Sequence, residues 1–511
     1  MDCVSKIQAL ALAAAAVIYG GEPLYARDSL AAVGRYLPST LFWEQVYGQP
    51  AAMPWQPCTG VGSVEASYAY NNQDTYHLLR DGEGGHAFGL AAEGTARRAL
   101  STLWGSASYG HLQREHVQWS SVADHFRMGP YQITDTIGGR VYGEQYRLSG
   151  GLAAPLGRWT LAAEIAYTAG NTYRRNDPRQ KTITSDLLTK VGVSVPLGRQ
   201  QAGLTLYGGS YQQDVNVNIM AFVDKGQVYA MRGFGLYDLL HSGYTSSFTW
   251  QYNGASYGAA AFLLPHSRKG WMLLGEAGRE SMESLAEPGS SISRYPFMLV
   301  TLRANALAGY SLRNSTAATE VRLRWNVQKS TGNERLYKQM APEGATLQGY
   351  HLLSESDKYT RALRQLTLSG LHERYGNRSS RWILLDVGVE SYAERYAYPA
   401  YEVSYLHATV QATAGGERRW KKSLLAAEVA LGYRRLVASD EKTPTDSYIF
   451  ALSMQPDLEV MASSPLSGSA KASFEHDFIG GTRWFTSVRA YGLRYRSRHA
   501  AWVAMAVGAV F

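Results

Sequence analysis

The sequence predicts an all-β protein, a closed antiparallel transmembrane β-barrel with short periplasmic turns and long extracellular loops. Three observations predict this fold. Polar and apolar residues alternate over long stretches, the connections between these stretches are alternately short and long, and the chain ends in an alternating apolar strand with a terminal aromatic residue. Barrels of the bacterial outer membrane show these features and have even strand numbers, and the signals together predict about 18 strands, within a range of roughly 16 to 20.

The composition excludes several other classes of protein. The 511 residues include 51 Gly and 35 Tyr, only 18% are charged, and the formal net charge is +8. Few charges and many aromatic residues exclude a disordered chain, and the composition does not fit a coiled coil. After the first 20 residues, no apolar run approaches the ~18–20 residues that a spanning helix needs. The positive charge is spread along the chain, so no nucleic-acid partner is expected.

Residues 1–26 are predicted to be a signal peptide. Lys6 precedes an apolar stretch at residues 7–19, a Gly-Gly-Glu-Pro sequence breaks that stretch, and Ala26 offers the small residue that signal peptidase prefers. A buried N-terminal helix is the alternative. Cleavage after Ala26 leaves Cys58 as the single cysteine, so neither an intrachain disulfide nor a cysteine-based metal site is expected.

Residues 27–60 are predicted to be a short N-terminal segment that lies in the periplasm or enters the barrel as a small plug. The segment has a helical pattern at residues 29–36 and then several aromatic and proline residues, namely Trp43, Tyr47, Pro50, Pro54, Trp55 and Pro57. It is far shorter than the folded plug of a TonB-dependent receptor. Residues 61–511 are then the barrel itself.

The strand prediction depends on side-chain alternation. In 319–328 the odd positions include Val321, Leu323 and Trp325, whereas the even positions are all charged or amide residues. Similar alternation occurs at 158–168, 383–391, 424–433 and 466–474. Strands of about 10 residues or more, tilted by about 45°, match the hydrocarbon thickness of a membrane. The sequence therefore predicts a wall with one apolar face and one polar face.

Short and long connections alternate along the chain. Short turns are predicted at 155–158, 197–200, 376–379 and 415–418, and long polar loops at about 115–140, 215–243, 331–359 and 437–463. Short turns on one side and long loops on the other are typical of outer-membrane barrels, in which both chain ends lie in the periplasm.

Tryptophans mark the starts of several predicted strands. Because the Trp ring is apolar and its N–H seeks water, Trp concentrates at membrane interfaces. The predicted periplasmic aromatic girdle consists of Trp159, Trp271, Trp382, Trp420 and Trp484. The last strand carries the apolar series Val503, Met505, Val507, Ala509 and Phe511. This series resembles the C-terminal signal by which bacterial outer-membrane barrels are recognised for insertion.

If the apolar face meets lipid, the charged residues of opposite parity face the lumen. The assigned lumen charges are Glu65, Glu93, Glu164, Lys190, Glu276, Glu280, Arg303, Glu320, Arg322, Arg324, Asp386, Glu390, Glu428, Lys471, Glu475 and Arg489. Acids and bases are mixed, unlike the single-sign lining of a strongly ion-selective pore. These charges either line a water-filled passage or pair with one another across a closed interior.

Taken over its whole length, the chain resembles the large set of outer-membrane β-barrel proteins of the Bacteroidota. The signal peptide, the Tyr-rich long strands and the Phe-terminated last strand carry this resemblance. It implies residence in the outer membrane, often beside nutrient-uptake machinery, and it brings no functional residues with it. The expected partners are outer-membrane lipid and lipopolysaccharide, the barrel assembly machinery during biogenesis and, as further candidates, a lipoprotein or a TonB-dependent receptor.

Three functions remain open. The first is a channel or accessory component for uptake of nutrients or other solutes, and the second is a plugged structural barrel that docks a lipoprotein, a TonB-dependent receptor or secretion machinery. The third and least favoured is an outer-membrane enzyme that modifies lipid. The stretch Gly254–Gly258 fits G-x-S-x-G, but a nucleophile elbow requires a following helix that is not predicted here. No catalytic residue, metal or cofactor is expected.

Overall fold

The computed structural model describes residues 38–56, 61–73, 76–98, 100–220, 227–241, 246–267, 269–287, 294–340, 349–478 and 482–511. Within them, eighteen strands form one closed antiparallel sheet, which confirms the predicted fold. The predicted signal peptide, the helical pattern at 29–36 and Cys58 lie outside the described residues. Within the described residues, no helix is long and apolar enough to cross a membrane.

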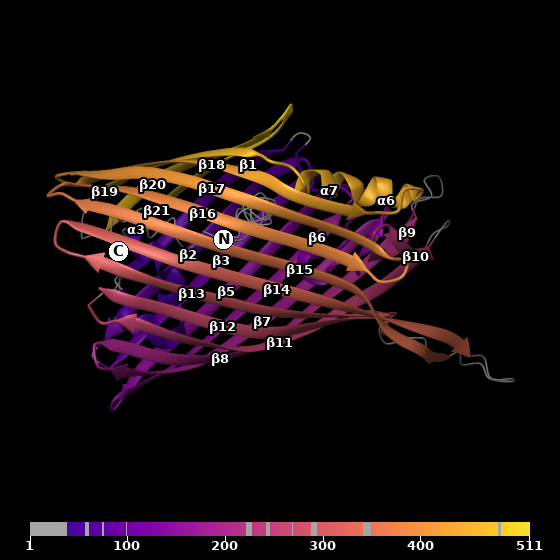
Figure 1. The fold of residues 1–511 in the computed structure, drawn as a ribbon, viewed down its shortest axis with the longest axis horizontal. Helices are drawn as coiled ribbons and strands as arrows, with labels where there is room; N and C mark the ends of the chain where they lie inside the picture. Colours follow the sequence, from indigo (N-terminus) through magenta and orange to yellow (C-terminus); the bar gives the residue numbers. More distant parts are fainter. Residues whose placement is uncertain are drawn as a thin grey trace.

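The wall strands follow one another around the barrel in chain order (Figure 1). They are β1 (Val61–Asn72), β2 (Gly84–Arg98), β3 (Ser101–Val117), β5 (Gly139–Leu156), β6 (Trp159–Arg174), β7 (Arg179–Leu197), β8 (Gln200–Ile219), β11 (Ser246–Pro265), β12 (Gly270–Ala286), β13 (Phe297–Arg313), β14 (Ala317–Met340), β15 (Gly349–Tyr375), β16 (Ser379–Tyr396), β17 (Tyr401–Trp420), β18 (Ser423–Lys442), β19 (Leu466–Asp477), β20 (Arg483–Tyr495) and β21 (Arg498–Val510).

The first and last strands close the sheet. β1 pairs antiparallel with β21, and beyond the strand end the Gly62 and Phe511 backbones exchange two hydrogen bonds of 2.9 and 3.0 Å. The Phe511 ring lies 2.6 Å from the position that a Cβ on Gly62 would take, so glycine leaves room for the terminal aromatic ring. Closure removes the unpaired sheet edges that could not face hydrocarbon.

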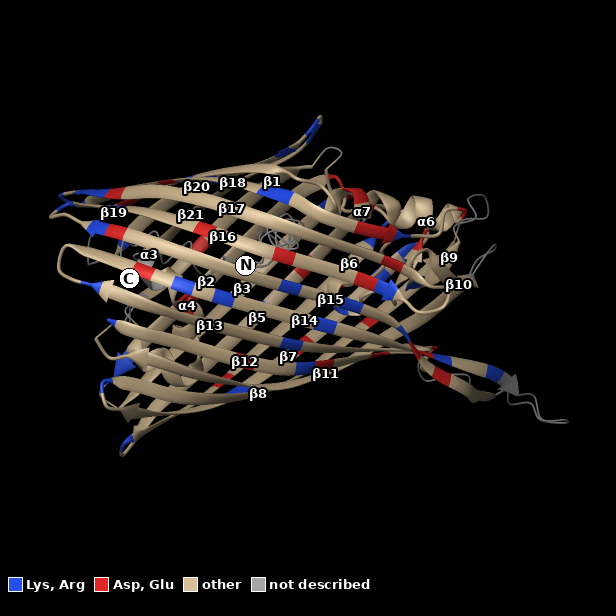
Figure 2. Cartoon of the chain, in the orientation of Figure 1, with Lys and Arg blue, Asp and Glu red and all other residues tan. Residues whose placement is uncertain are grey.

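The two faces of the wall differ in polarity as the alternation predicts. On β14 the side chains of Val321, Leu323 and Trp325 are 48%, 45% and 47% exposed, whereas Glu320, which precedes Val321, is buried on the inner face. Figure 2 shows Lys and Arg at several of the short turns and charges of both signs along the wall. The wall therefore presents an apolar exterior around a polar interior.

The connections fall into two groups. Turns such as 157–158, 198–199 and 376–378 join strands at one end of the barrel, the short-turn end, where β1 begins and β21 ends. The opposite end, the long-loop end, carries the longer connections 118–138, 220–245 and 443–465.

Two predicted connections are wrong in their position. Residues 415–418 lie inside β17, and the turn falls at Lys421–Lys422, because the glycines there continue the ladder to β18. Residues 331–359 are mostly strand, because β14 and β15 continue to pair with each other up to Met340 and Gly349 after their other neighbours have ended. The resulting ribbon projects from the barrel in Figure 1.

The N-terminal residues 38–55 lie inside the barrel near the short-turn end. They form α3 (Pro38–Phe42), α4 (Glu44–Tyr47) and the 3-10 helix η1 (Pro50–Trp55), which together we call the inner plug. Their apolar side chains pack against inward residues of the wall in one cluster that includes Ala153, Ala162, Ala260, Phe262, Leu274, Leu307, Leu371 and Trp382. The segment therefore belongs to the barrel interior.

Small wall residues make room for the inner plug. The Trp43 ring reaches to 2.4 Å from the position of a Cβ on Gly309, and Ala51 lies 3.1 Å from that position on Gly192. The Ser194 hydroxyl donates a hydrogen bond of 2.9 Å to the Ala51 carbonyl. Packing and a buried polar contact both hold η1 against β7.

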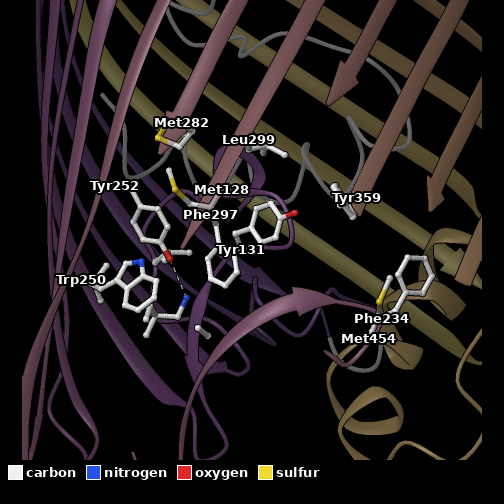
Figure 3. Packing of buried hydrophobic residues seen from close by; sticks show 14 of the residues in the cluster. Met128, Tyr131, Phe234, Trp250, Tyr252, Met282, Phe297, Leu299, Tyr359 and Met454 are labelled. Atoms are coloured by element: carbon white, nitrogen blue, oxygen red, sulfur yellow. Dashed lines mark hydrogen bonds between the residues drawn. The ribbon is translucent and has the colours of Figure 1, made fainter. Parts of the chain in front are cut away.

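The long-loop end is covered by elements that fold inward, which we call the outer cap. The cap contains α5 (His125–Met128), α6 (Tyr448–Ser453) and α7 (Gln455–Met461), together with a small sheet of β4 (Ile133–Asp135), β9 (Val228–Gly233) and β10 (Leu236–His241). Figure 3 shows Met128 and Tyr131 from the 118–138 connection packed against Trp250, Tyr252 and Phe297 of the wall. The Tyr252 hydroxyl accepts a hydrogen bond of 3.1 Å from the Ile133 backbone N–H.

Adjacent residues on β17 allow a test of the two faces. Val410 is exposed on the outer face, and Gln411 is directed inward and is paired in register with Asp386. We expect Val410→Arg to destabilise the barrel in lipid vesicles by about 2–4 kcal/mol, because it places a charge in hydrocarbon. Gln411→Arg is the matched control and should cost less. Urea unfolding in phospholipid vesicles measures both, and equal losses would contradict the assigned faces.

Candidate functional site: a chamber in the barrel lumen

A cavity of about 770 Å³ lies in the lumen between the inner plug and the outer cap. We call it the central chamber. The plug contributes Glu44, Gln45 and Gln49, and the cap contributes Arg127. The wall contributes charged and amide side chains, among them Asp186, Lys190, Glu276, Glu280, Arg303, Asn305, Asn326 and Gln328. The chamber is therefore lined by groups that can bind a polar solute.

Arg127 connects the cap to the wall at the roof of this chamber. Its Nε donates a short hydrogen bond to Glu280, and its Nη1 lies 2.8 Å from Asp186 Oδ2. Its guanidinium also lies 4.2 Å from the centre of the Tyr211 ring. Arg303 Nη2 holds the second Glu280 oxygen at 3.0 Å. Because Glu280 is buried, its charge needs these two cations.

Four of the sixteen predicted lumen charges line the central chamber, namely Lys190, Glu276, Glu280 and Arg303. Others make contacts within the wall or to the plug. Glu164 pairs with Lys190 at 3.0 Å, and Glu475 pairs with Arg483 at 3.2 Å. Arg322 donates to the Phe42 carbonyl of the plug and lies 4.1 Å over its ring.

The remaining predicted charges are also buried or half-buried. Glu320 accepts from Ser311, Glu390 from Gln365 and Arg434, Asp386 from Ser369, and Glu93 from Ser63. Glu65 is buried, and the side chains of Arg324, Lys471 and Arg489 are half-buried. The structure thus distributes these charges over the inner wall and brings only a minority together around the chamber.

Trp382 departs from the predicted girdle. Trp159, Trp271, Trp420 and Trp484 are exposed on the outer face, but Trp382 is only 9% exposed and belongs to the cluster around the inner plug. Its Nε1 donates a hydrogen bond of 3.2 Å to Glu428, and its ring covers Gly415 on the next strand. The position of Trp382 just after a short turn did not indicate whether its side chain would face outward or inward.

The surroundings of Trp382 are repeated elsewhere on the wall. Trp382, Gly415, Glu428 and Lys471 are register partners across β16 to β19. Trp104, Gly151, Glu164 and Lys190 form the same row across β3, β5, β6 and β7, and Trp104 Nε1 donates to Glu164 at 3.0 Å. In both rows the glycine leaves space for an inward Trp to reach the glutamate one strand further on.

The C-terminal series lies on the outer face. Val503, Met505, Val507 and Phe511 are exposed, and Ala509 is half-buried beside them. This placement is compatible with the predicted insertion signal, which stays a prediction. Gly254–Gly258 lies within β11, so the strand-to-helix turn of a nucleophile elbow is not formed there.

Sequence reasoning missed several residues of the site. Asp186 shares the parity of Lys190 on β7, and Asn305 that of Arg303 on β13, so the alternation could have found them. Arg127 lies in a connection without periodicity, and Glu44 lies in the N-terminal segment. No local signal shows that these two segments meet inside the barrel.

A buried polar cluster links three segments of the outer cap. Asp81 follows β1, His125 lies on α5 with its Nε2 3.5 Å from Asp81 Oδ1, and Asp457 on α7 accepts a hydrogen bond of 2.8 Å from the Leu79 N–H. Burial raises the pKa of Asp81 to about 7, partly offset by Arg114. Burial likewise raises the pKa of Asp457 to about 6.

In the same cluster, burial lowers the pKa of His125 whereas it raises the pKa of the two carboxyl groups. Burial and the neighbouring Arg80, Arg114 and Arg361 hold the pKa of His125 well below its usual range. Burial therefore disfavours the charged form of both the His125 imidazole and the Asp81 carboxyl. Within the described residues, no group of three or more His, Cys, Asp or Glu side chains is placed to hold a metal ion.

The chain belongs to the family described as "Family of unknown function (DUF6850)", whose model matches residues 50–511. No curated protein matches the chain.

Several solved structures resemble the chain in fold. The ferric preacinetobactin receptor BauA from Acinetobacter baumannii is 7% identical, with a TM-score of 0.39 over 88% of this chain and 80% of the receptor. A mutant of the ferric enterobactin receptor PfeA from Pseudomonas aeruginosa is 9% identical, with a TM-score of 0.37 over 89% and 81%. The copper transporter OprC is 9% identical, with a TM-score of 0.36 over 88% and 80%. The pairing of β1 with β21 in the chain itself establishes the closed barrel.

The pKa of Asp81 leads to a test of the cap. Because this pKa is raised above its unfolded value of 3.8, the stability that Asp81 gives the cap is complete below about pH 4 and is lost as pH rises through about 7. Asp81→Asn removes the buried charge, so we expect roughly tenfold or greater protection of α5 and α7 amides from hydrogen exchange at pH 8 and no gain near pH 4. Asp238→Asn, at an exposed site on β10, is the control. A gain for Asp81→Asn that is the same at both pH values would contradict the assignment.

Proposed function

We propose that this protein is an outer-membrane uptake barrel whose central chamber binds a solute and whose inner plug closes the periplasmic side. The central chamber is the observation that carries this proposal, because it combines a polar wall with a floor and a roof from separate segments of the chain. The short-turn end is then periplasmic and the long-loop end extracellular, as in other outer-membrane barrels.

The inner plug is suited to act as a displaceable closure. It is a short segment at one end of the barrel, and its helices make no strand pairing with the wall. Its contacts include packing against small wall residues, the Ser194 hydrogen bond, the Arg322 contact to Phe42 and the stacking of Trp55 on His266. Such contacts can be exchanged without breaking the barrel ladder, because no ladder hydrogen bond depends on them.

Further assignments belong to the same proposal. Residues 1–26 direct export, the exterior meets outer-membrane lipid and lipopolysaccharide, and the barrel assembly machinery inserts the chain through its C-terminal strand. The protein acts in transport and has no catalytic role. The resemblance to barrels of the Bacteroidota stays a prediction of the sequence.

A partner-docking barrel is the second candidate, and the projecting ribbon favours it. Beyond Arg335 and before Lys358, the described residues of β14 and β15 pair only with each other, so both edges of this part of the ribbon are open. Leu336, Leu352 and Leu353 are exposed on it. Open edges and exposed apolar side chains can add a strand from a lipoprotein or a receptor. Co-purification from native membranes that is lost when residues 336–353 are replaced by a short turn would support docking, and unchanged co-purification would argue against it.

Displacement of the plug tests the uptake proposal. Gly192→Leu puts a side chain where Ala51 of the plug lies, so we expect single-channel conductance in planar bilayers to rise at least severalfold above that of the native protein. Gly275→Leu is the matched control, because nothing lies within 4 Å of its Cβ position, and it should behave as the native barrel does. A folded Gly192→Leu barrel with unchanged conductance would contradict the plug's role.

A further inference from the structure

A second cavity, of about 450 Å³, lies above the central chamber on the side of the outer cap. We call it the upper chamber. Arg127, Arg303 and Gln328 line both cavities, so the two adjoin one another. The inner faces of β15 and β16, the flanks of α5, the β1–β2 connection and α7 form its walls. Its volume is within the range of small-molecule sites in proteins.

Two arginines, Arg361 and Arg80, supply hydrogen-bond donors and positive charge to the upper chamber. Arg361 on β15 makes one hydrogen bond, from Nη2 to the Phe126 carbonyl at 3.2 Å, and no carboxylate of the described residues lies within ion-pair distance of it. Arg80 makes no ion pair of 4 Å or less within the described residues, and its buried Nε has no acceptor, although its charge lowers the pKa of the nearby Asp81 and Asp457. A guanidinium offers five N–H donors, so these two side chains keep most of their donors for another acceptor.

Several other interior arginines are paired with a carboxylate. Arg174 is held by Asp135, Arg434 by Glu390, and Arg127 and Arg303 share Glu280. Pairing is thus the usual arrangement of buried arginines in this chain. Glu394 also lines the upper chamber, but one of its oxygens already accepts a hydrogen bond of 2.5 Å from the Tyr392 hydroxyl.

The upper chamber also presents apolar and aromatic surface, beside the side chains of Asp124, His125 and Asp457. Phe126 and Tyr359 present ring surfaces, and Leu363, Met454 and Leu458 add aliphatic and thioether surface from the wall and the cap. A ligand that fits this combination has a compact anionic group for the two guanidiniums and an apolar body for the opposite wall. Guanidinium groups match carboxylate and phosphate geometry, and aromatic rings accept apolar ligand surface.

We propose that the upper chamber binds small organic anions, in which a carboxylate or phosphate contacts Arg361 and Arg80 and an apolar body packs against the aromatic side. This inference rests on the proposed uptake function, since it names the class of solute that the barrel would take. Binding is nevertheless measurable without transport, so the two proposals can fail separately.

Binding to the purified full-length protein in a neutral detergent tests the site. Phenyl phosphate and benzoate are the anionic probes, benzyl alcohol is the neutral analogue, and inorganic phosphate lacks the apolar body. Ligand-observed saturation-transfer NMR, with detergent micelles alone as the blank, gives the affinities. We expect at least tenfold weaker binding of benzyl alcohol and of inorganic phosphate than of the tighter anionic probe.

Matched variants locate the site. Arg361→Gln should weaken the tighter probe at least tenfold, and Arg80→Gln, which lies in a connection outside the ladder, should do the same if Arg361→Gln lowers the yield of folded barrel. Arg435→Gln, at an exposed position on β18, should leave binding unchanged. Equal affinity for phenyl phosphate, benzoate and benzyl alcohol, or unchanged binding in folded Arg361→Gln and Arg80→Gln, would overturn the proposal. Conductance of Gly192→Leu is measured without these probes, so loss of the anion site leaves the uptake test intact.

Discussion

The whole structure depends on one constraint, the closure of a hydrogen-bonded sheet that has no free edge. The contact between Gly62 and Phe511 completes the ladder that β2 to β20 continue around the barrel. Once the sheet is closed, each strand has one face outside and one inside. Alternate side chains therefore face the exterior and the lumen. Apolar residues occupy most outer positions, and charged residues such as Glu280 and Lys190 line the interior.

A barrel of eighteen strands is too wide for wall side chains alone to fill, so other segments occupy the lumen. The inner plug does so at the short-turn end through small wall residues such as Gly192, and the outer cap does so at the other end through an aromatic cluster around Tyr131. Between them the wall keeps its charges, and Arg127 bridges cap and wall through Glu280. In the part of the chain that the structure describes, packed layers therefore alternate with polar chambers along the interior.

Because of this arrangement, buried ionisable side chains are found where separate segments of the chain meet. Asp81, His125 and Asp457 come from three parts of the chain, and the cap excludes water from all of them. In the same region Arg361 and Arg80 keep unused donors, whereas Arg174, Arg434, Arg127 and Arg303 are each held by an acid. Guanidinium donors beside aromatic surface are consistent with the proposed recognition of an anion in the upper chamber.

The sequence by itself determined the all-β class, the even strand number near 18, and the face of most wall residues, because alternation in a closed sheet is a local property that each strand carries on its own. Charged positions such as Glu280 and Lys190 were assigned to the lumen for that reason. Trp382 shows the limit, since its inward direction depends on Gly415 and Glu428, which lie on the next two strands. Only the tertiary structure decided that Glu44 and Arg127 meet around one chamber and that 331–359 continues as strand, because these features depend on distant pairing and on segments without periodicity.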